Sequence, residues 1–226
     1  MKKRTWILAA VVLAVAGVGG VAVLKAKAAS VEDAFQADAD AKRKADVHEI
    51  AERVEAYRVR AGRPPFADRL ESGGGAYTVI IGAPKAEQAL MSEGNPLGGD
   101  QPAAGAVDLG RELRAVLGGD GSLPVDPQRG ATGGAPNAYY LRVKPGGQYL
   151  VAAFLRRPDD RAVQVAPGIW AYALRSEAGA WGAPIWNHAR TLAQVSPEER
   201  GAIIEAGRKA EAKFARYART RSDPPS

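Results

Sequence analysis

Few residues of this chain have the type and spacing that chemistry requires. The chain has no cysteine and only two histidines, His48 and His188. Cysteine nucleophiles and cysteine-based metal sites are therefore excluded. Histidine works as an acid, a base or a metal ligand beside a suitable partner group. His48 lies next to Glu49 on a predicted helix, where we expect a solvated side chain. His188 lies in a predicted loop, where we expect a structural or incidental role.

Other chemical motifs are incomplete. Asp159-Asp160 offers two adjacent carboxylates, whereas calcium takes about six to eight oxygen ligands, so we expect a turn there. Gly73-Gly74-Gly75 lacks the Lys and Ser/Thr that complete a phosphate-binding loop. The sequence has no nucleophile elbow, although spacing alone does not exclude a Ser-His-Asp triad. The sequence therefore predicts no catalytic residue, no cofactor or metal site and no small-molecule substrate.

Length and composition allow one folded domain with an anchor, or two small domains. The chain has 226 residues, of which 46% are apolar and 25% are charged, which is the composition of a globular protein. The net charge of +6 comes from 31 basic and 25 acidic residues. Binding to nucleic acid requires a concentrated basic face with aromatic residues. The sequence has no such face, so we expect no nucleic-acid partner.

The strongest single pattern is an uncharged apolar run of 19 residues, from Trp6 to Leu24. As a helix it would be about 28 Å long, close to the thickness of bilayer hydrocarbon. Such a helix pairs all its backbone polar groups internally, as lipid requires. Gly17 and Gly20 would let a partner helix approach closely. The alternative is that they are small residues with no partner helix. The predicted membrane-anchor residues are Trp6, Ile7, Leu8, Val11, Val12, Leu13 and Leu24.

Charges around this run predict its orientation. Lys2, Lys3 and Arg4 precede it, which favours a cytoplasmic N-terminus and a periplasmic C-terminal domain in a bacterial inner membrane. The alternative is cleavage at Ala26-Lys27-Ala28, whose small-x-small form would release the domain into the periplasm. Retention is favoured because a typical signal peptide has an apolar region of about 7–15 residues.

A long amphipathic helix is predicted next. Residues 30–60 contain no proline and no glycine, and Ser30-Val31-Glu32-Asp33 resembles a capping box. If this segment continues the apolar run, one helix covers residues 5–61. The remaining faces, which carry Lys42, Arg43 and Lys44, are expected to face solvent. One face is apolar at spacings of three and four, through Val47, Ile50, Val54, Tyr57 and Ala61.

A small sheet is predicted after the long helix. Tyr77–Ile81 has the composition of a strand. Segments 138–143 and 148–155 flank a Pro-Gly turn and predict a β-hairpin. A third strand is expected in 162–165 or 169–174. Together these strands would form an antiparallel sheet that the apolar stripe covers, which gives an α+β fold. Trp170, Trp181 and Trp186 are expected to pack in the core or in loops.

Two more helices are predicted. Asp108 can cap a helix that ends at Gly118-Gly119. Ser196-Pro197-Glu198-Glu199 has the form of a capping box with proline at the first helical position. The C-terminal helix that follows is expected to pack on the domain. The alternative is a basic amphipathic helix that docks on a partner or an anionic membrane surface.

The order of these elements resembles the type IV pilin and type II secretion pseudopilin family. The resemblance covers about residues 5 to 160. It rests on a tyrosine and a glycine that end the long helix, on a Leu-Pro-x-Asp-Pro loop and on the hairpin with its Gly-Gly turn. The residues that match are Tyr57, Gly62, Pro65, Leu123, Pro124, Asp126 and Pro127. The resemblance implies a pilin-like fold, with a transmembrane helix that continues into a helix packed on a small antiparallel sheet. The C-terminal helix is an addition to that fold.

The chain also departs from the family. No glycine precedes Thr5-Trp6-Ile7-Leu8, where family members are cleaved by a prepilin peptidase. The apolar run has no glutamate, which in the family neutralises the N-terminus of the neighbouring subunit. Pro64 replaces the usual tyrosine. The resemblance therefore implies a permanent anchor or an accessory subunit rather than a polymerising pilin.

Three regions follow from this reading. Residues 1–29 are expected to be the anchor, 30–178 the pilin-like domain and 179–226 a C-terminal extension. The expected function is that of a non-enzymatic structural component of a type II secretion or type IV pilus-like machine. Its expected partners are the lipid bilayer and other subunits of that machine. The alternative is a membrane-tethered or secreted periplasmic binding module unconnected with secretion.

Overall fold

The fold is α+β, as predicted. The chain has two compact units, residues 1–37 and 38–226. In the described part it contains three α-helices and a six-stranded mixed sheet. The computed structural model describes residues 2–68, 76–81, 108–128, 138–144, 146–181 and 184–222. Within these ranges, side chains are described between residues 32 and 216.

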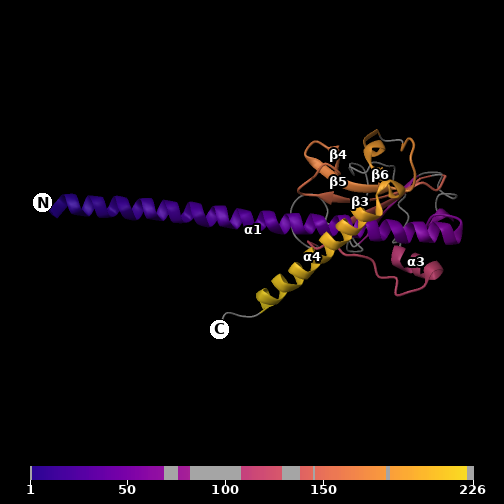
Figure 1. Cartoon of the computed structure of the whole chain (residues 1–226), viewed down its shortest axis with the longest axis horizontal. Helices are drawn as coiled ribbons and strands as arrows, with labels where there is room; N and C mark the ends of the chain where they lie inside the picture. The colour runs from indigo at the N-terminus through magenta and orange to yellow at the C-terminus, as the bar shows by residue number, and fades with distance from the viewer. Residues whose placement is uncertain are drawn as a thin grey trace. The chain divides into compact units, whose positions relative to one another are not determined.

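Helix α1 is continuous from Lys2 to Ala61 (Figure 1). The prediction that the apolar run and the amphipathic segment form one helix is therefore confirmed, and Ser30 lies inside the helix rather than at its start. The helix ends before Gly62, whose φ of 70° is a left-handed conformation that glycine adopts without steric cost.

The predicted anchor lies outside the residues whose side chains are described. In the part that is described, no helix is both long enough and apolar enough to cross a membrane. The residues concerned are Trp6, Ile7, Leu8, Val11, Val12, Leu13 and Leu24, with Gly17 and Gly20.

The sheet has the strand order β1-β2-β3-β5-β4, and these neighbours are all antiparallel. The predicted hairpin is confirmed as β2–β3, and both segments offered for a third strand form strands. The strands are β1 (Tyr77–Ile81), β2 (Tyr139–Val143), β3 (Tyr149–Leu155), β4 (Val163–Ala166) and β5 (Ile169–Arg175).

The expectation of a purely antiparallel sheet is wrong at one edge. Strand β4 pairs with β5 only as far as Ala171, which leaves Leu174 and Arg175 open on that edge. The chain returns there after a short 3₁₀ helix, η1 (Pro184–His188). The two-residue strand β6 (Arg190–Thr191) then pairs with β5 in parallel.

Each face of the sheet packs its own core, because side chains alternate across a strand. On one face the apolar stripe of α1 packs against Leu141, Val151 and Leu174, and helix α3 (Leu109–Leu117) adds Leu113. The predicted cap of α3 is confirmed, since Asp108 accepts a hydrogen bond from the Arg111 backbone N–H at 3.0 Å.

The opposite face carries the late tryptophans. Phe154 and Leu150 of β3 belong to a second buried cluster with Trp181 and Trp186. The prediction that the tryptophans pack in the core is confirmed for these two, while Trp170 on β5 is only partly buried. Burial of both faces explains why all seven residues of β3 are buried.

Helix α4 (Pro197–Ser222) packs on the domain, as expected, and its contact there is with α1. Ile203 and Ala210 are buried, and between them Gly207 lies so close to α1 that an added Cβ would overlap the Cβ of Ala45. The predicted cap is present, because Ser196 Oγ accepts from the Glu199 N–H at 3.1 Å. The Glu199 carboxylate, however, accepts from Arg190 at 2.6 Å.

Candidate functional site: a buried charge network on the long helix

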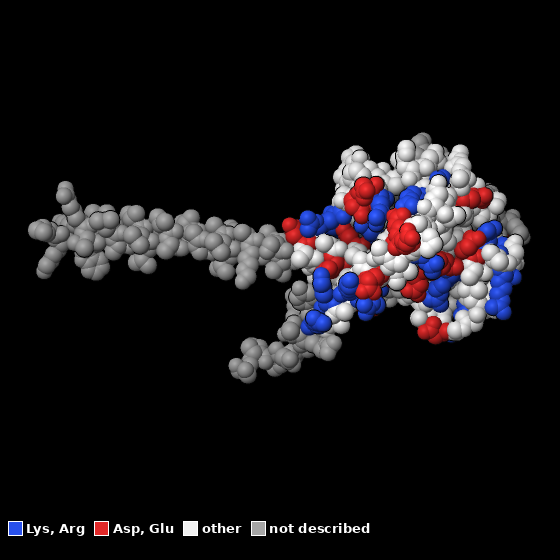
Figure 2. Space-filling view, in the orientation of Figure 1, with Lys and Arg blue, Asp and Glu red and all other residues white. Residues whose placement is uncertain are grey.

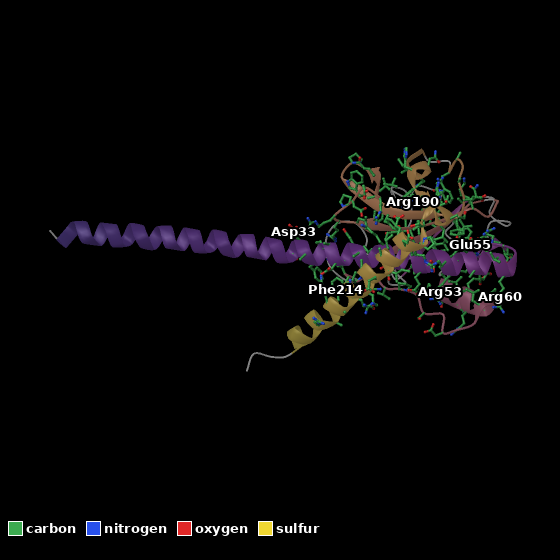
Figure 3. All side chains as sticks on the ribbon, in the orientation of Figure 1. Asp33, Arg53, Glu55, Arg60, Arg190 and Phe214 are labelled. Atoms are coloured by element: carbon green, nitrogen blue, oxygen red, sulfur yellow. The ribbon has the colours of Figure 1, made fainter. Side chains whose placement is uncertain are left out.

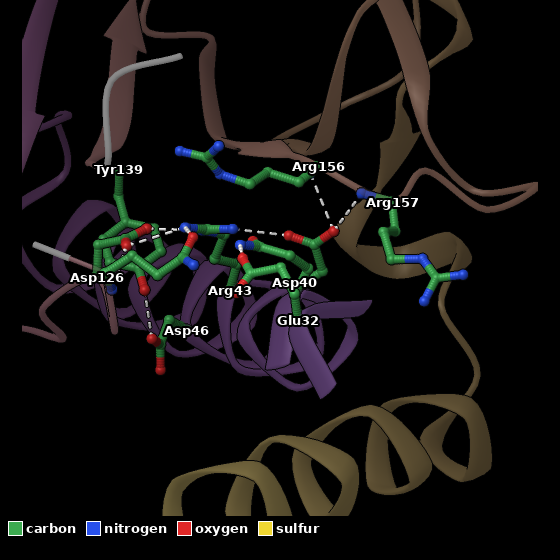
Figure 4. A network of polar contacts seen from close by, with 10 residues as sticks. Glu32, Asp40, Arg43, Asp46, Asp126, Tyr139, Arg156 and Arg157 are labelled. Atoms are coloured by element: carbon green, nitrogen blue, oxygen red, sulfur yellow. Dashed lines mark hydrogen bonds and ion pairs between the residues drawn. The ribbon is translucent and has the colours of Figure 1, made fainter. Parts of the chain in front are cut away.

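Arg43 on α1 is the centre of a buried network of charged side chains (Figure 4). Its side chain is only 2% exposed, so the expectation that this residue faces solvent is wrong. Its Nε and Nη2 donate to the two carboxylate oxygens of Asp126 at 2.7 and 3.0 Å. Its Nη1 donates to Asp40 at 2.7 Å. The guanidinium is buried because the loop that carries Asp126 crosses α1 at this point.

The polar atoms around Arg43 have partners within the protein. The second carboxylate oxygen of Asp40 accepts from the backbone N–H groups of Arg156 and Arg157 at 3.0 and 2.6 Å. Gln128 accepts from Arg43 through its side chain at 2.8 Å and donates its backbone N–H to Asp126 at 2.8 Å. The network therefore joins α1, the Asp126 loop and the segment after β3.

The electrostatics of this network keep Arg43 charged. Burial by itself would lower the pKa of Arg43. The hydrogen bonds and charges of Asp126 and Asp40 outweigh burial and raise that pKa above its ordinary value. A buried ion pair is tolerated only when its geometry is good and its remaining donors and acceptors are satisfied, and both conditions are met here.

Three buried tyrosines of the sheet also reach polar groups on α1. They come from β2, β3 and β5, so they contact the helix at three positions along its length. Burial raises the pKa of each phenol, which keeps the hydroxyls protonated. An apolar stripe alone would tolerate small shifts of α1, whereas these directional bonds fix it. The pairs are Tyr139 with Asp46 at 2.5 Å, Tyr149 with Glu55 at 2.9 Å and Tyr172 with His48 at 2.8 Å.

His48 is fully buried, so the prediction of a solvated histidine is wrong. Its Nε2 bonds to the Tyr172 hydroxyl, and its Nδ1 has no hydrogen-bond partner among the described residues. Burial is the main cause that lowers the pKa of His48 to about 4, with a contribution from the charges of Arg200 and Arg190 and an opposing one from Glu199. The imidazole is therefore neutral at neutral pH.

Replacing His48 by phenylalanine should change how stability depends on pH. Because the pKa of His48 is below its ordinary 6.5 in the folded chain, its contribution to stability is complete above pH 6.5 and is lost as the pH falls towards 4. His48→Phe loses the bond to Tyr172 at neutral pH. Its stability relative to the unchanged chain should then rise by about 1–3 kcal/mol between pH 6.5 and 4.

Urea unfolding of the full chain in detergent at several pH values measures this difference. Asp46 acts in the opposite sense, because burial raises its pKa to about 6, so its stabilising effect is lost as the pH rises through 6. The comparison between the two chains removes that background. His188→Phe is the matched control, because His188 is exposed. A parallel pH dependence for His48→Phe and the unchanged chain would refute the assignment.

The other residues considered for catalysis or metal binding lie apart from one another. His188 lies on the surface in η1. Asp159 forms the expected turn, in which it accepts from the Arg161 N–H at 3.2 Å, and it pairs with Lys44 at 2.5 Å. No group of three or more potential metal ligands occurs among the residues that the structure describes.

The family-motif residues hold the chain segments around α1. Tyr57 donates to Glu112 of α3 at 2.6 Å, and burial raises its pKa to about 12. The carbonyl of Pro65 accepts from the Tyr77 hydroxyl on β1. Leu123 packs against the core, and Asp126 between Pro124 and Pro127 is the main partner of Arg43. Gly62 supplies the turn that ends α1.

Sequence reasoning missed Arg43, Asp40 and His48, although a signal was present for two of them. Asp40 and Arg43 continue the buried stripe towards the N-terminus at the same spacing of three and four residues. Charged residues in line with an apolar stripe indicate buried pairs. The partners of Arg43 in the Asp126 loop lie more than 80 residues away, and no local pattern predicts them.

The bonds of this site indicate a structural role, which is to hold α1 against the Asp126 loop and the segment after β3. Its charged groups bond to one another or to the backbone. Searches of protein-family models, curated proteins and solved structures found no match to this chain.

Proposed function

We propose that the protein is a non-enzymatic, membrane-anchored structural subunit with a pilin-like domain, which belongs to an envelope machine of the type II secretion or type IV pilus kind. The observation that carries this proposal is the continuity of α1 from Lys2 to Ala61. One helix includes the uncharged run of residues 6–24 and the buried stripe on which the sheet is built.

The internal bonding of unit 38–226 supports a structural role. The Arg43 network and the three tyrosine contacts fix α1 against the sheet by bonds that α1 would have to break in order to slide. Bonds of this kind suit a domain that keeps one fixed arrangement. The missing peptidase site and the missing glutamate in residues 6–24 favour an accessory or anchoring subunit over a polymerising one.

Helix contacts within the bilayer are the proposed means of assembly. Gly17 and Gly20 lie three residues apart and so share a helix face, on which small side chains let a partner helix approach. At 100° per residue, Val15 and Ala22 lie on the opposite face. The two faces can therefore be compared by experiment within one helix.

Photocrosslinking in intact cells tests the proposal. A small diazirine side chain is introduced at Gly20, and in separate chains at Val15 and Ala22 as matched controls. We expect protein adducts from Gly20, identified by mass spectrometry as membrane subunits of one assembly, and mainly lipid adducts from the two controls. Lipid adducts alone from all three positions would contradict the proposal.

A further inference from the structure

The end of α4 differs from its beginning in both packing and charge. The first part packs on α1 through Ile203, Gly207 and Ala210. After Ala210, every described side chain except the partly buried Phe214 is exposed. Figure 3 marks Phe214 on this helix. In the turns that follow Ala210, the described side chains therefore add little to the core.

These turns are strongly basic. Figure 2 shows blue Lys and Arg atoms along the described end of α4. Between Gly207 and Ser222 the only acidic residue is Glu211. The basic residues of the same stretch are Arg208, Lys209, Lys213, Arg216, Arg219 and Arg221.

Arg208 and Lys209 form only exposed ion pairs within the chain. Arg208 and Lys209 share one carboxylate, that of Glu205, at 2.8 and 3.4 Å, and all three side chains are 44–70% exposed. Exposed pairs of this kind contribute little to stability and exchange readily for other anions. We propose that the C-terminal end of α4, from Arg208 to Ser222, binds an anionic phospholipid surface.

Chain length favours lipid over an acidic protein as the anion. Lys213 Nζ lies 2.8 and 3.0 Å from the two carboxylate oxygens of Asp38, which ties the basic helix to the start of the second unit. Asp38 follows Leu24 by 14 residues of α1, or about 21 Å of helix. Nine more residues of α4 follow Lys213 and add about 13 Å. A tether of this length keeps the headgroups at a high effective concentration.

The residue types also suit a membrane surface. Helices rich in Lys and Arg bind anionic membrane surfaces by electrostatic attraction to the lipid headgroups, and six basic residues lie between Arg208 and Arg221. The inference rests on one part of the proposed function, namely that residues 6–24 anchor the chain in the membrane.

Site-specific fluorescence on the full chain tests this inference. Because the chain has no cysteine, Ser222→Cys gives one labelling position for a polarity-sensitive dye. The labelled chain is reconstituted into vesicles of phosphatidylcholine, or of equal parts phosphatidylcholine and phosphatidylglycerol. We expect a blue shift and protection from an aqueous quencher only in the anionic vesicles. Both effects should weaken when the salt concentration rises from about 0.1 M to 1 M, which shortens the Debye length from about 10 to 3 Å.

Charge removal supplies the control. Replacing Arg216, Arg219 and Arg221 by glutamine should lower the docking equilibrium on the order of 100-fold, at roughly fivefold for each charge. Replacing Arg58, Arg60 and Arg63 by glutamine removes the same charge at the other end of the domain and should leave docking unchanged. Equal dye signals in both vesicle types, or equal effects of the two triple variants, would overturn the inference. Alkaline extraction after the dye reading tests the anchor separately. Loss of the chain from both vesicle types would overturn the proposed function and the tether that the inference needs, whereas retention of the chain with equal dye signals would overturn the inference alone.

Discussion

Arg43→Met should lower the free energy of unfolding by about 3–5 kcal/mol, because removal of one partner leaves a buried charge without compensation. Among the described residues, Asp126 would keep its bond from the Gln128 N–H, and Asp40 its bonds from two backbone N–H groups. Methionine fills part of the volume but supplies no donor. Urea unfolding of the full chain in detergent, followed by the fluorescence of the buried Trp181 and Trp186, measures the loss.

Two further variants show whether the loss comes from the network. Arg58→Met is the matched control, since Arg58 is 44% exposed on the same helix and pairs with Glu55. It should cost no more than about 1 kcal/mol. Asp126→Asn should be costly in the unchanged chain and much less so when Arg43 is already methionine, because the pair acts as a unit. Two results would show that the network does not depend on Arg43. One is an equal loss of unfolding free energy for Arg43→Met and Arg58→Met, and the other is strict additivity of Arg43→Met and Asp126→Asn.

Replacing glycine by alanine at two positions of helix α4 should change the stability of the chain in opposite directions. Gly207→Ala places a Cβ against the Cβ of Ala45 on α1, where both backbones are already in close contact. Overpacking of this kind typically costs about 1–3 kcal/mol. Gly201→Ala, in the same helix, meets nothing within 4 Å. It should stabilise the helix by about 0.4–1 kcal/mol.

Opposite signs for the two alanines are the expected result. Thermal unfolding measures both, and hydrogen exchange shows whether the destabilisation at Gly207 is confined to α4 and the facing part of α1. If both variants gain stability, α4 does not pack on α1 through Gly207. If both lose stability, the cause is not the close approach of the two helices.

The elements that the sequence predicted are those with a local periodic signal. The stripe from Val47 to Ala61, the hairpin of β2 and β3 and the capped starts of α3 and α4 depend on residues close together in the chain. Spacings of three and four or of two are enough to identify such elements. The sequence therefore predicted the α+β class and the main packing of α1 on the sheet.

The site depends on contacts that no local pattern contains. The sequence pattern indicates a single buried face of the helix, and this pattern places Arg43 and His48 on solvated faces. In the structure, α1 is enclosed by the sheet, by the loop of Asp126 and by α4. Asp126 belongs to a recognisable motif, but its partner and its burial depend on the fold. The parallel strand β6 likewise depends on an edge that β4 leaves open.

The interpretation of the whole chain depends on whether residues 6–24 remain attached and in the membrane. The pilin-like reading and the docking of α4 both require a chain that keeps this segment. Cleavage at Ala26-Lys27-Ala28 would instead give a released domain, for which a periplasmic binding module is the appropriate hypothesis. The mass of the mature chain and its behaviour at alkaline pH distinguish these two outcomes.

Membrane fractionation followed by intact-mass analysis is the most direct measurement. Cell membranes are washed with alkaline carbonate, and the protein is measured in the pellet and in the supernatant. The account predicts that the pellet holds a chain whose mass still includes residues 6–24. A mature chain that begins near Ala29 and is recovered in the supernatant would contradict it.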